Sequence, residues 1–245
     1  MKGSFLEKNS RRNNLVLASA GIIGLSLFTL SSSGIDSHLV SATQVLFQDN
    51  YCSSAGWTQI GTEITVNSST NPCVAYYNNE MGGGGVTQER VYKQISSPLP
   101  HKWTADFAYE FTASSIPAAL VFDLTSTSDD PQTLSPANRI LIEHGNGLDQ
   151  LFITGSGSKG VDSAPISISP NVQYYVTLAR TPTHLKLGVF SDAARTIQVP
   201  GSPVSIPMLQ SDFSNLNFIQ HDGCTLCGSA RTLTAQITNT TITTG

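Results

Sequence analysis

The sequence predicts an all-β fold, a two-sheet antiparallel jelly-roll sandwich preceded by an N-terminal hydrophobic helix that serves as a signal or an anchor. Two patterns carry this prediction. Apolar and polar residues alternate along most of the chain, and no segment beyond the N-terminus has the apolar stripe of a helix. Clusters of Gly, Pro, Asn, Asp and Ser separate the alternating runs and are typical of turns.

The N-terminal segment, residues 1–42, has the features of an export signal or a membrane anchor. Four basic residues come first: Lys2, Lys8, Arg11 and Arg12. An uncharged apolar run from Leu15 to Leu30 follows, which is the order of a signal peptide. The run is shorter than the roughly 20 residues of a comfortable bilayer span, which favours a cleaved signal. Cleavage after Ala42 would lie far beyond Leu30, so an uncleaved anchor stays an alternative.

One domain is expected after this segment, over residues 45–243. We expect strands at 58–67, 90–95, 103–114, 118–126, 138–145, 150–157, 173–181, 184–192, 216–222 and 231–242. In the hairpin 173–192, six apolar side chains are expected on one side of a sheet: Tyr174, Val176, Leu178, Leu185, Leu187 and Val189. Because most strands have such an apolar face, a second sheet must cover it, which gives a sandwich.

Composition limits the classes of function. With 245 residues, 39% of them hydrophobic, the chain can bury one substantial core. Only 12% of the residues are charged, while Ser, Thr, Asn and Gly are plentiful, as in many extracellular β-proteins. The formal net charge of −4 offers no basic field for phosphate groups, which excludes nucleic acid as an expected partner.

All cysteines lie beyond the N-terminal segment: Cys52, Cys73, Cys224 and Cys227. An even number suits an oxidising compartment, and we expect the two local pairs, 52 with 73 and 224 with 227. The two other pairings stay open. His221 lies three residues before Cys224 and offers a metal-site alternative, but no fourth ligand is nearby. Asn67 and Asn239 begin Asn-x-Ser/Thr sequons and are candidate glycosylation sites.

Several segments resemble the concanavalin A-like lectin and glucanase superfamily, which includes laminin-G-like modules. The hairpin "YYVTLARTPTHLKLGVFSD" looks like the central hairpin of those modules. More narrowly, "GWTQIG", "RVYKQI", "WTADFAYEFTASSIPA" and "GSARTLTAQITNT" look like a group of secreted archaeal proteins with this fold. The resemblance covers about residues 46–243. It implies a concanavalin A-like jelly roll and, by analogy of fold alone, recognition of carbohydrate or of a surface.

Known catalytic patterns are missing from the sequence. The glucanase branch of the family uses an E-x-D-x-E arrangement that places two carboxyl groups together, and this arrangement does not occur here. Asp106 and Glu110 share a strand face and form an unorthodox candidate pair, although two exposed acids on a polar sheet face explain these residues better. The histidines are scattered, with no Ser/His/Asp order. We therefore expect a protein that is not an enzyme.

The candidate cofactor is Ca²⁺. The loop "TSTSDDPQ" carries Asp129 and Asp130, which Asp123 or Asp149 from neighbouring strands could join. Calcium takes six to eight oxygen ligands, so a loop rich in oxygens is the place to expect it. The alternative is a plain turn in which Asp bonds to the local backbone.

Two groups of residues are candidates for ligand contacts. His144, Asn146 and Asp149 in "EHGNGLDQ" could meet sugar hydroxyl groups at a sheet edge, although a hairpin turn explains the same residues. Tyr76 and Tyr77 could form a stacking platform for a sugar ring, as could Trp103 if exposed, although aromatic residues in strands are more often core.

The function expected from these observations is a secreted or surface-attached, non-catalytic module that binds glycan or another extracellular polymer. The first alternative is a structural or adhesive cell-surface protein that acts through protein contacts, and a glycoside hydrolase comes third. Membrane contact is expected only through the N-terminal segment, if that segment stays attached.

Overall fold

The computed structural model describes residues 43–78, 89–115, 119–145, 149–223 and 232–245. The predicted signal or anchor therefore lies outside the described residues, and so does its expected helix. Within the ranges described, no helix combines the length and the hydropathy that a membrane crossing needs.

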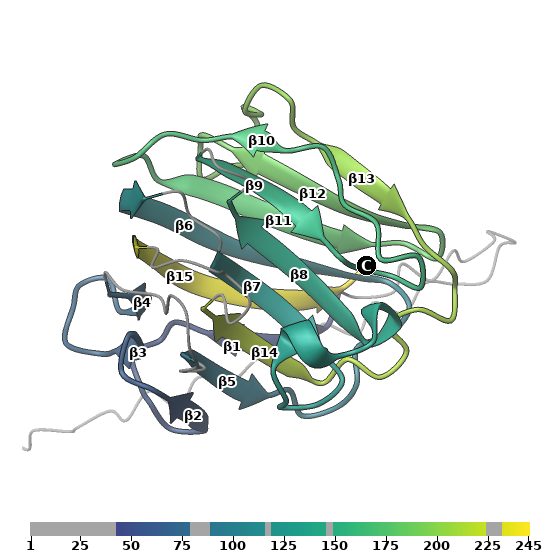
Figure 1. Cartoon of the computed structure of the whole chain (residues 1–245), viewed down its shortest axis with the longest axis horizontal. Coiled ribbons are helices and arrows are strands. Elements are labelled where there is room, and N and C mark those ends of the chain that lie inside the picture. The colour runs from purple at the N-terminus through teal and green to yellow at the C-terminus, as the bar shows by residue number, and fades with distance from the viewer. Residues whose placement is uncertain (1–42, 79–88, 116–118, 146–148, 224–231) are drawn as a thin grey trace, which may run out of the picture. The chain divides into compact units, whose positions relative to one another are not determined.

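The described chain is all-β, as predicted, and forms two antiparallel sheets (Figure 1). The eight-stranded sheet has the order β13-β12-β11-β6-β15-β4-β3, and β1 also pairs with β15. Its strands are β1 (Val45–Asp49), β3 (Ile64–Asn67), β4 (Val74–Tyr77), β6 (Trp103–Ser115), β11 (Tyr174–Arg180), β12 (His184–Phe190), β13 (Val204–Pro207) and β15 (Thr232–Thr244).

The seven-stranded sheet has the order β10-β9-β8-β7-β14-β5-β2. Its strands are β2 (Trp57–Ile60), β5 (Arg90–Gln94), β7 (Ala119–Thr125), β8 (Arg139–His144), β9 (Gln150–Thr154), β10 (Ile166–Ser167) and β14 (Phe218–Asp222). Two short 3₁₀ helices, η1 (Pro131–Thr133) and η2 (Pro136–Asn138), lie in the connection from β7 to β8.

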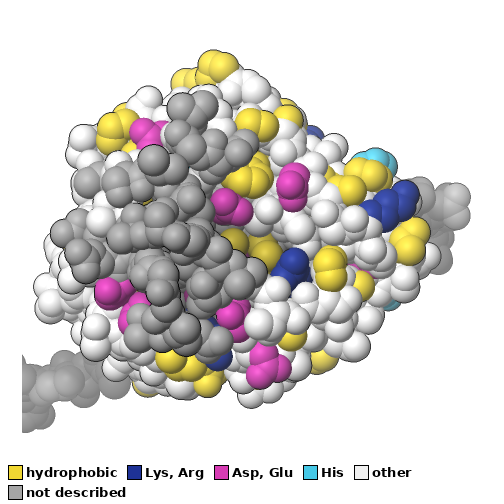
Figure 2. Space-filling model, in the orientation of Figure 1, with side chains coloured by type: hydrophobic (Ala, Val, Ile, Leu, Met, Phe, Trp, Pro, Cys, Tyr) yellow, Lys and Arg dark blue, Asp and Glu magenta, His cyan; other side chains and the backbone are white. Residues whose placement is uncertain are grey.

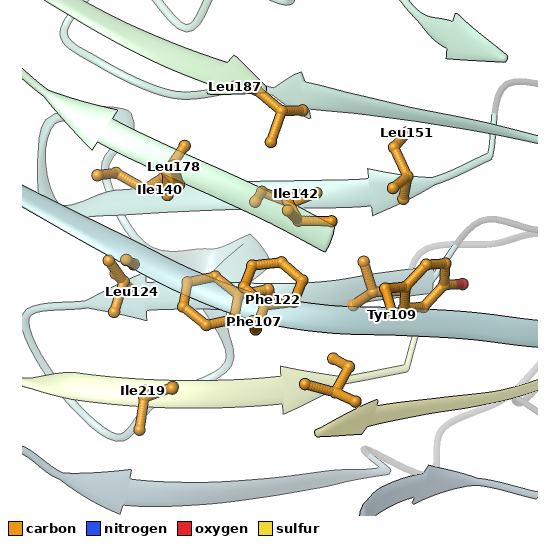
Figure 3. Close-up of a cluster of buried hydrophobic side chains, with 14 of the residues drawn as sticks. Phe107, Tyr109, Phe122, Leu124, Ile140, Ile142, Leu151, Leu178, Leu187 and Ile219 are labelled. Atoms are coloured by element: carbon orange, nitrogen blue, oxygen red, sulfur yellow. The ribbon is translucent and has the colours of Figure 1, made fainter. Parts of the chain in front are cut away.

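The core lies between the sheets. Phe107 of β6 stacks on Phe122 of β7 with ring centroids 4.5 Å apart, which joins the two layers directly. Figure 3 shows side chains from both sheets meeting in this space, including Leu178 of β11 and Ile142 of β8. Both residues are fully buried. Face-to-face packing of two apolar sheet faces is the arrangement that the alternating sequence predicts.

The hairpin of β11 and β12 has the predicted register and faces. Val176 pairs with Val189, and Leu178 pairs with Leu187, and all four side chains are fully buried. At the end of β11, the buried Arg180 guanidinium donates to the backbone oxygens of Pro100, Gln210, Asp212 and Phe213. This arginine therefore holds the segment around residues 210–213 against the hairpin.

The predicted strand 58–67 is wrong as a single element. The structure divides it into β2 and β3, which belong to different sheets, and the chain turns between them at Gly61. Gly61 has φ of +78°, a conformation that side chains with a Cβ rarely adopt. The Glu89 carboxylate accepts hydrogen bonds from the next two backbone N–H groups, those of Thr62 and Glu63. The corner thus depends on a distant residue, which alternation does not reveal.

Candidate functional site

The outer face of the seven-stranded sheet contains a hollow of about 270 Å³, here called the β8–β9 hollow. Its lining residues are Glu143, Phe152, Thr154, Asp162, Ser163 and Pro165. Glu143 of β8 pairs with Phe152 of β9, and Thr154 lies two residues further on, so all three side chains point away from the core. The segment 161–165 forms the remaining wall.

Hydrogen bonds hold this wall in place. Asp162 Oδ1 accepts from the Gly155 N–H at 2.7 Å and from the Thr154 hydroxyl at 3.2 Å. Ser163 Oγ accepts from the Ile153 N–H at 3.0 Å and donates to the Ala164 oxygen. The hollow therefore presents carboxylates, hydroxyl groups and one aromatic ring on a rigid scaffold. Figure 2 shows acidic and hydrophobic side chains close together on one face of the molecule.

A hollow of about 350 Å³ lies beside β1 and β5 and is lined by Gln48, Asp49, Asn50, Ser53 and Lys93. Its charged groups are engaged with one another. Lys93 Nζ lies 2.7 Å from Asp49 Oδ2, and the Trp57 indole N–H donates to the same oxygen at 3.0 Å. This hollow therefore has a cation–carboxylate pair, whereas the β8–β9 hollow is lined by carboxylates and hydroxyl groups.

The predicted sugar contacts at the β8–β9 turn are brought together only in part. His144 Nε2 lies 3.5 Å from Asp149 Oδ1, and the Ser114 hydroxyl donates to that oxygen at 2.5 Å. His144 is fully buried, however, and its Nδ1 shares a 2.6 Å hydrogen bond with the Tyr109 hydroxyl. The prediction that His144 contacts a ligand is therefore wrong, because the residue is fully buried. Asn146 lies outside the described residues.

Burial also changes the charge of this histidine. Removal from water lowers the pKa of His144 to about 4, although the Asp149 carboxylate acts in the opposite direction. The imidazole is therefore neutral at neutral pH. It belongs to a polar connection between the sheets, since Tyr109 is on β6 and His144 on β8.

The predicted stacking platform of Tyr76 and Tyr77 is wrong, because neighbouring side chains on a strand point to opposite faces. Tyr77 is fully buried, and its hydroxyl donates to the Val121 oxygen at 2.9 Å. Tyr76 faces outward and lines a hollow of about 100 Å³ on the eight-stranded sheet together with Glu110. Trp103 is fully buried as well, so it offers no surface to a ligand.

The candidate acid pair on β6 is occupied by local partners. Asp106 Oδ1 accepts from the Thr177 hydroxyl at 2.6 Å and lies 3.1 Å from Arg195 Nε. Glu110 Oε2 accepts from Gln236 Nε2 at 3.1 Å. Both carboxylates lie on the outer face of the eight-stranded sheet, in the plain arrangement that the sequence also allowed.

Asp129 and Asp130, the candidate calcium ligands, have local roles in the loop after β7. Asp130 Oδ1 accepts from the Gln132 N–H at 2.9 Å and caps helix η1, while Asp129 Oδ2 accepts from the Thr127 hydroxyl at 2.8 Å. Among the described residues, no group of three or more His, Cys, Asp or Glu side chains is spaced to hold a metal ion. The loop donors therefore do not fit the predicted calcium site.

Cys52 and Cys73 are joined as a disulfide, with Cα atoms 5.0 Å apart, in the local pairing expected from the sequence. Cys224 and Cys227 lie outside the described residues. Asn67 ends β3, and Asn239 is exposed on β15; glycosylation at both stays a prediction.

Three polar residues on the outer face of the seven-stranded sheet were missed as a group, here called the β7–β14 oxygen cluster: Asp123, Gln220 and Asp222. Gln220 pairs with Asp123 across β14 and β7, and Asp222 lies two residues further along β14. All three are fully buried. Burial raises the pKa of Asp123 and of Asp222 well above the usual range, and mutual repulsion adds to the shift of Asp123.

The residues of the β8–β9 hollow were also missed. The sequence places Glu143 and Phe152 in neighbouring predicted strands, and alternation gives both the face opposite Ile142 and Ile153. Alternation could therefore have identified these two residues. It could not have identified Asp162, because the position of Asp162 depends on how the segment after β9 folds back.

Comparison with known proteins gives the fold but no family. No family model matches the sequence, and no curated protein matches it. Among solved structures, arcelin-5, a lectin-like defence protein from Phaseolus vulgaris, superposes with a TM-score of 0.53 at 12% identity. The winged bean acidic lectin complexed with methyl-α-D-galactose has the same TM-score at 10% identity. Both alignments cover 83% of this chain and 98% of the neighbour.

Peanut lectin, solved with a nine-residue peptide, has a TM-score of 0.50 at 12% identity and covers 82% of this chain and 97% of its own. Superpositions at such low sequence identity show a shared lectin-like sandwich fold and do not identify a ligand or a function. The likeness to secreted archaeal proteins gains no support from these neighbours and stays a prediction.

Proposed function

We propose that this protein is a non-catalytic module that binds glycan, and that the sugar occupies the β8–β9 hollow. The observation that carries the proposal is the convergence of Glu143, Asp162 and Phe152 in one hollow on a rigid sheet face. The lectin-like fold supports it by analogy, and one neighbour was solved with a bound galactoside.

The chemistry of the hollow suits a neutral sugar. Carboxylates accept hydrogen bonds from sugar hydroxyl groups, and the Thr154 and Ser163 hydroxyls can both donate and accept. The Phe152 ring, 7% exposed, offers a small apolar surface to the C–H groups of a sugar ring. None of the described residues that line the hollow is Lys or Arg, so they offer no counter-charge to an anionic sugar.

We further propose that the protein acts outside the cell. The basic and apolar order of residues 1–42 supports export, and the Cys52–Cys73 disulfide is stable in oxidising compartments. The partner is then a glycan of the cell exterior.

The test is a glycan array probed with the full chain, followed by competition with the free sugar. Glu143→Gln keeps the shape of the side chain and removes its charge. We expect it to weaken binding at least about tenfold, because a hydrogen bond to a charged group contributes about 1.5–3 kcal/mol. Glu110→Gln is the matched control on the other sheet and should bind as the unchanged protein does.

Three results would contradict the proposal. Equal losses of glycan affinity in Glu143→Gln and Glu110→Gln would show that the sugar does not bind in the β8–β9 hollow. Self-association without any response to sugar would favour the adhesive alternative. Release of reducing ends from a polysaccharide would make the protein a hydrolase.

A further inference from the structure

The hollow beside β1 and β5, here called the β1–β5 hollow, has a lysine at its surface. Its lining residues include one acid and one base, and they are Gln48, Asp49, Asn50, Ser53 and Lys93. Lys93 and Asp49 form an ion pair, but only 7% of the Asp49 side chain is exposed, compared with 26% of the Lys93 side chain. Because the interaction between charges weakens with distance, a ligand in the hollow meets the ammonium group more strongly than the buried carboxylate.

The Asp49 carboxylate is engaged within the protein. Its Oδ1 accepts from the Tyr51 N–H at 2.6 Å, and its Oδ2 accepts from the Trp57 indole N–H at 3.0 Å and from Lys93 Nζ at 2.7 Å. Lys93 Nζ also donates to the Ala55 oxygen at 3.1 Å, which uses the second of the three N–H donors of an ammonium group. One N–H of Lys93 is therefore left for an acceptor in the hollow.

Two other lining side chains keep donors after their local hydrogen bonds are made. Asn50 Oδ1 accepts from the Cys52 N–H at 3.1 Å, and Ser53 Oγ accepts from the Ala55 N–H at 3.1 Å. Within the described part of the chain, the Asn50 amide nitrogen and the Ser53 hydroxyl donate no hydrogen bond. The hollow thus combines an ammonium group with neutral N–H and O–H donors, a set that suits an oxyanion.

The segment that carries these donors is fixed on two sides. The Cys52–Cys73 disulfide ties it to the residue before β4. Tyr51 is fully buried, and its hydroxyl shares hydrogen bonds with Thr240 Oγ1 at 2.6 Å and with His221 Nε2 at 3.0 Å. Groups that are already ordered lose less conformational entropy when a ligand binds, so this segment is suited to hold one.

We propose that the β1–β5 hollow binds the oxyanion group of an acidic sugar, either the carboxylate of a uronic acid or a sulfate ester. Lys93 donates a charge-assisted hydrogen bond to the oxyanion, and Asn50 and Ser53 donate neutral ones. The Gln48 amide both donates and accepts, which suits the hydroxyl groups of the sugar ring. The volume of about 350 Å³ lies within the range of small-molecule sites. This site is separate from the β8–β9 hollow, whose charged lining residues are acids.

The experiment is a calorimetric titration of the full chain, at neutral pH and low salt, with trigalacturonic acid, with galactose 6-sulfate and with sodium sulfate. We expect at least one of the two sugars to bind, and the one that binds identifies the oxyanion. Binding should weaken as NaCl is added, because salt screens exposed charges.

Lys93→Met keeps most of the side-chain length and removes the charge. It should weaken binding at least about tenfold, because a hydrogen bond to a charged group is lost. Lys186→Met is the matched control, since it removes an exposed lysine from β12, and it should keep the affinity within about twofold.

Asn50→Asp is a second variant that leaves the pair of Lys93 and Asp49 intact. The new side chain keeps the oxygen that accepts from the Cys52 N–H and adds a negative charge to the hollow, so it should weaken binding about fivefold or more. Asn171→Asp adds the same charge at an exposed position between β10 and β11 and is the control for net charge.

Failure of both sugars to bind at millimolar concentration overturns the proposal. Undiminished binding in either Lys93→Met or Asn50→Asp overturns it as well, and so does sodium sulfate that binds as tightly as the sugars, because the hollow would then hold any small anion. Glu143→Gln should leave the binding of the acidic sugar unchanged, and a loss there would move this sugar to the β8–β9 hollow. The inference and the proposed function can therefore fail separately.

Discussion

His144 makes the stability of the folded protein depend on pH. Its pKa is about 4 in the folded state because of burial, compared with about 6.5 for an exposed histidine. Between these values the unfolded chain binds a proton that the folded chain does not, so stability is complete above pH 6.5 and falls as the pH approaches 4. The loss from this one residue is about 3 kcal/mol.

The prediction is therefore that His144→Asn reduces the pH dependence of stability between pH 6.5 and 4, and that His221, whose pKa burial also lowers to about 4, maintains the rest. Urea unfolding at a series of pH values measures it, and the difference in slope from the unchanged protein isolates this residue. His184→Asn, a change at an exposed histidine, is the control and should keep the original slope. Equal slopes in all three proteins would show that His144 does not titrate in this range.

At the scale of the residue, the sequence did not indicate which individual side chains are exposed to solvent. Tyr76 and Tyr77 are identical in kind, yet one lines a surface hollow and the other lies in the core. Alternation predicts that the two differ, but which of them faces outward depends on the register of β4 against β15, where Ala235 pairs with Tyr77. The burial of His144 likewise depends on Tyr109, which is distant in sequence.

At the scale of the element, the strongest single tie is the arginine at the end of β11. Arg180 joins that strand to four backbone oxygens in two other segments, and its side chain is only 2% exposed. Removal of the guanidinium would leave buried carbonyl groups unpaired, and each such group costs about 1–3 kcal/mol.

We therefore predict that Arg180→Met lowers the free energy of unfolding by about 3 kcal/mol or more. The urea midpoint, taken with an unchanged slope, measures it. Arg195→Met removes a half-exposed arginine that has one ion pair, with Asp106, and should cost less than about 1 kcal/mol. Similar losses in the two variants would mean that Arg180 is not a structural tie.

The long, regular strands were predictable and the short ones were not. β6, β7, β11, β12 and β15 follow from alternation with small shifts at their ends, because each has enough residues to show a period of two. β10 has two residues and β4 has four, too few to show a period. The corner at Gly61 was missed because it is stabilised by Glu89, a contact between distant parts of the chain.

At the scale of the whole molecule, the two-sheet fold followed from the sequence while the site did not. An apolar sheet face must be covered by another layer, so a sandwich can be predicted without knowing which residues are in contact. The β8–β9 hollow and the β7–β14 oxygen cluster depend on which strands are neighbours. Phe218–Asp222 and Ala119–Thr125 lie side by side, although about one hundred residues separate them.

Export is the prediction that belongs to the whole chain. We expect protein recovered from outside the producing cell to begin at Thr43, because a basic segment followed by a short apolar run is removed after translocation. N-terminal sequencing and intact mass under non-reducing conditions measure this. Recovery of a chain that keeps Met1 in the membrane fraction would favour the uncleaved anchor, and retention in the cytosol with free thiols would contradict export altogether.

The strand order also determines when, during synthesis, the two sheets can be completed. β15 lies between β4 and β6 and also pairs with β1, and β14 lies between β5 and β7, so the tail of the chain sits in the middle of both sheets. While a ribosome is still making the polypeptide, the earlier strands of each layer have a gap where their central neighbour belongs. Neither layer can close before β14 and β15 are available, which keeps the earlier strands of the nascent chain unpaired until then.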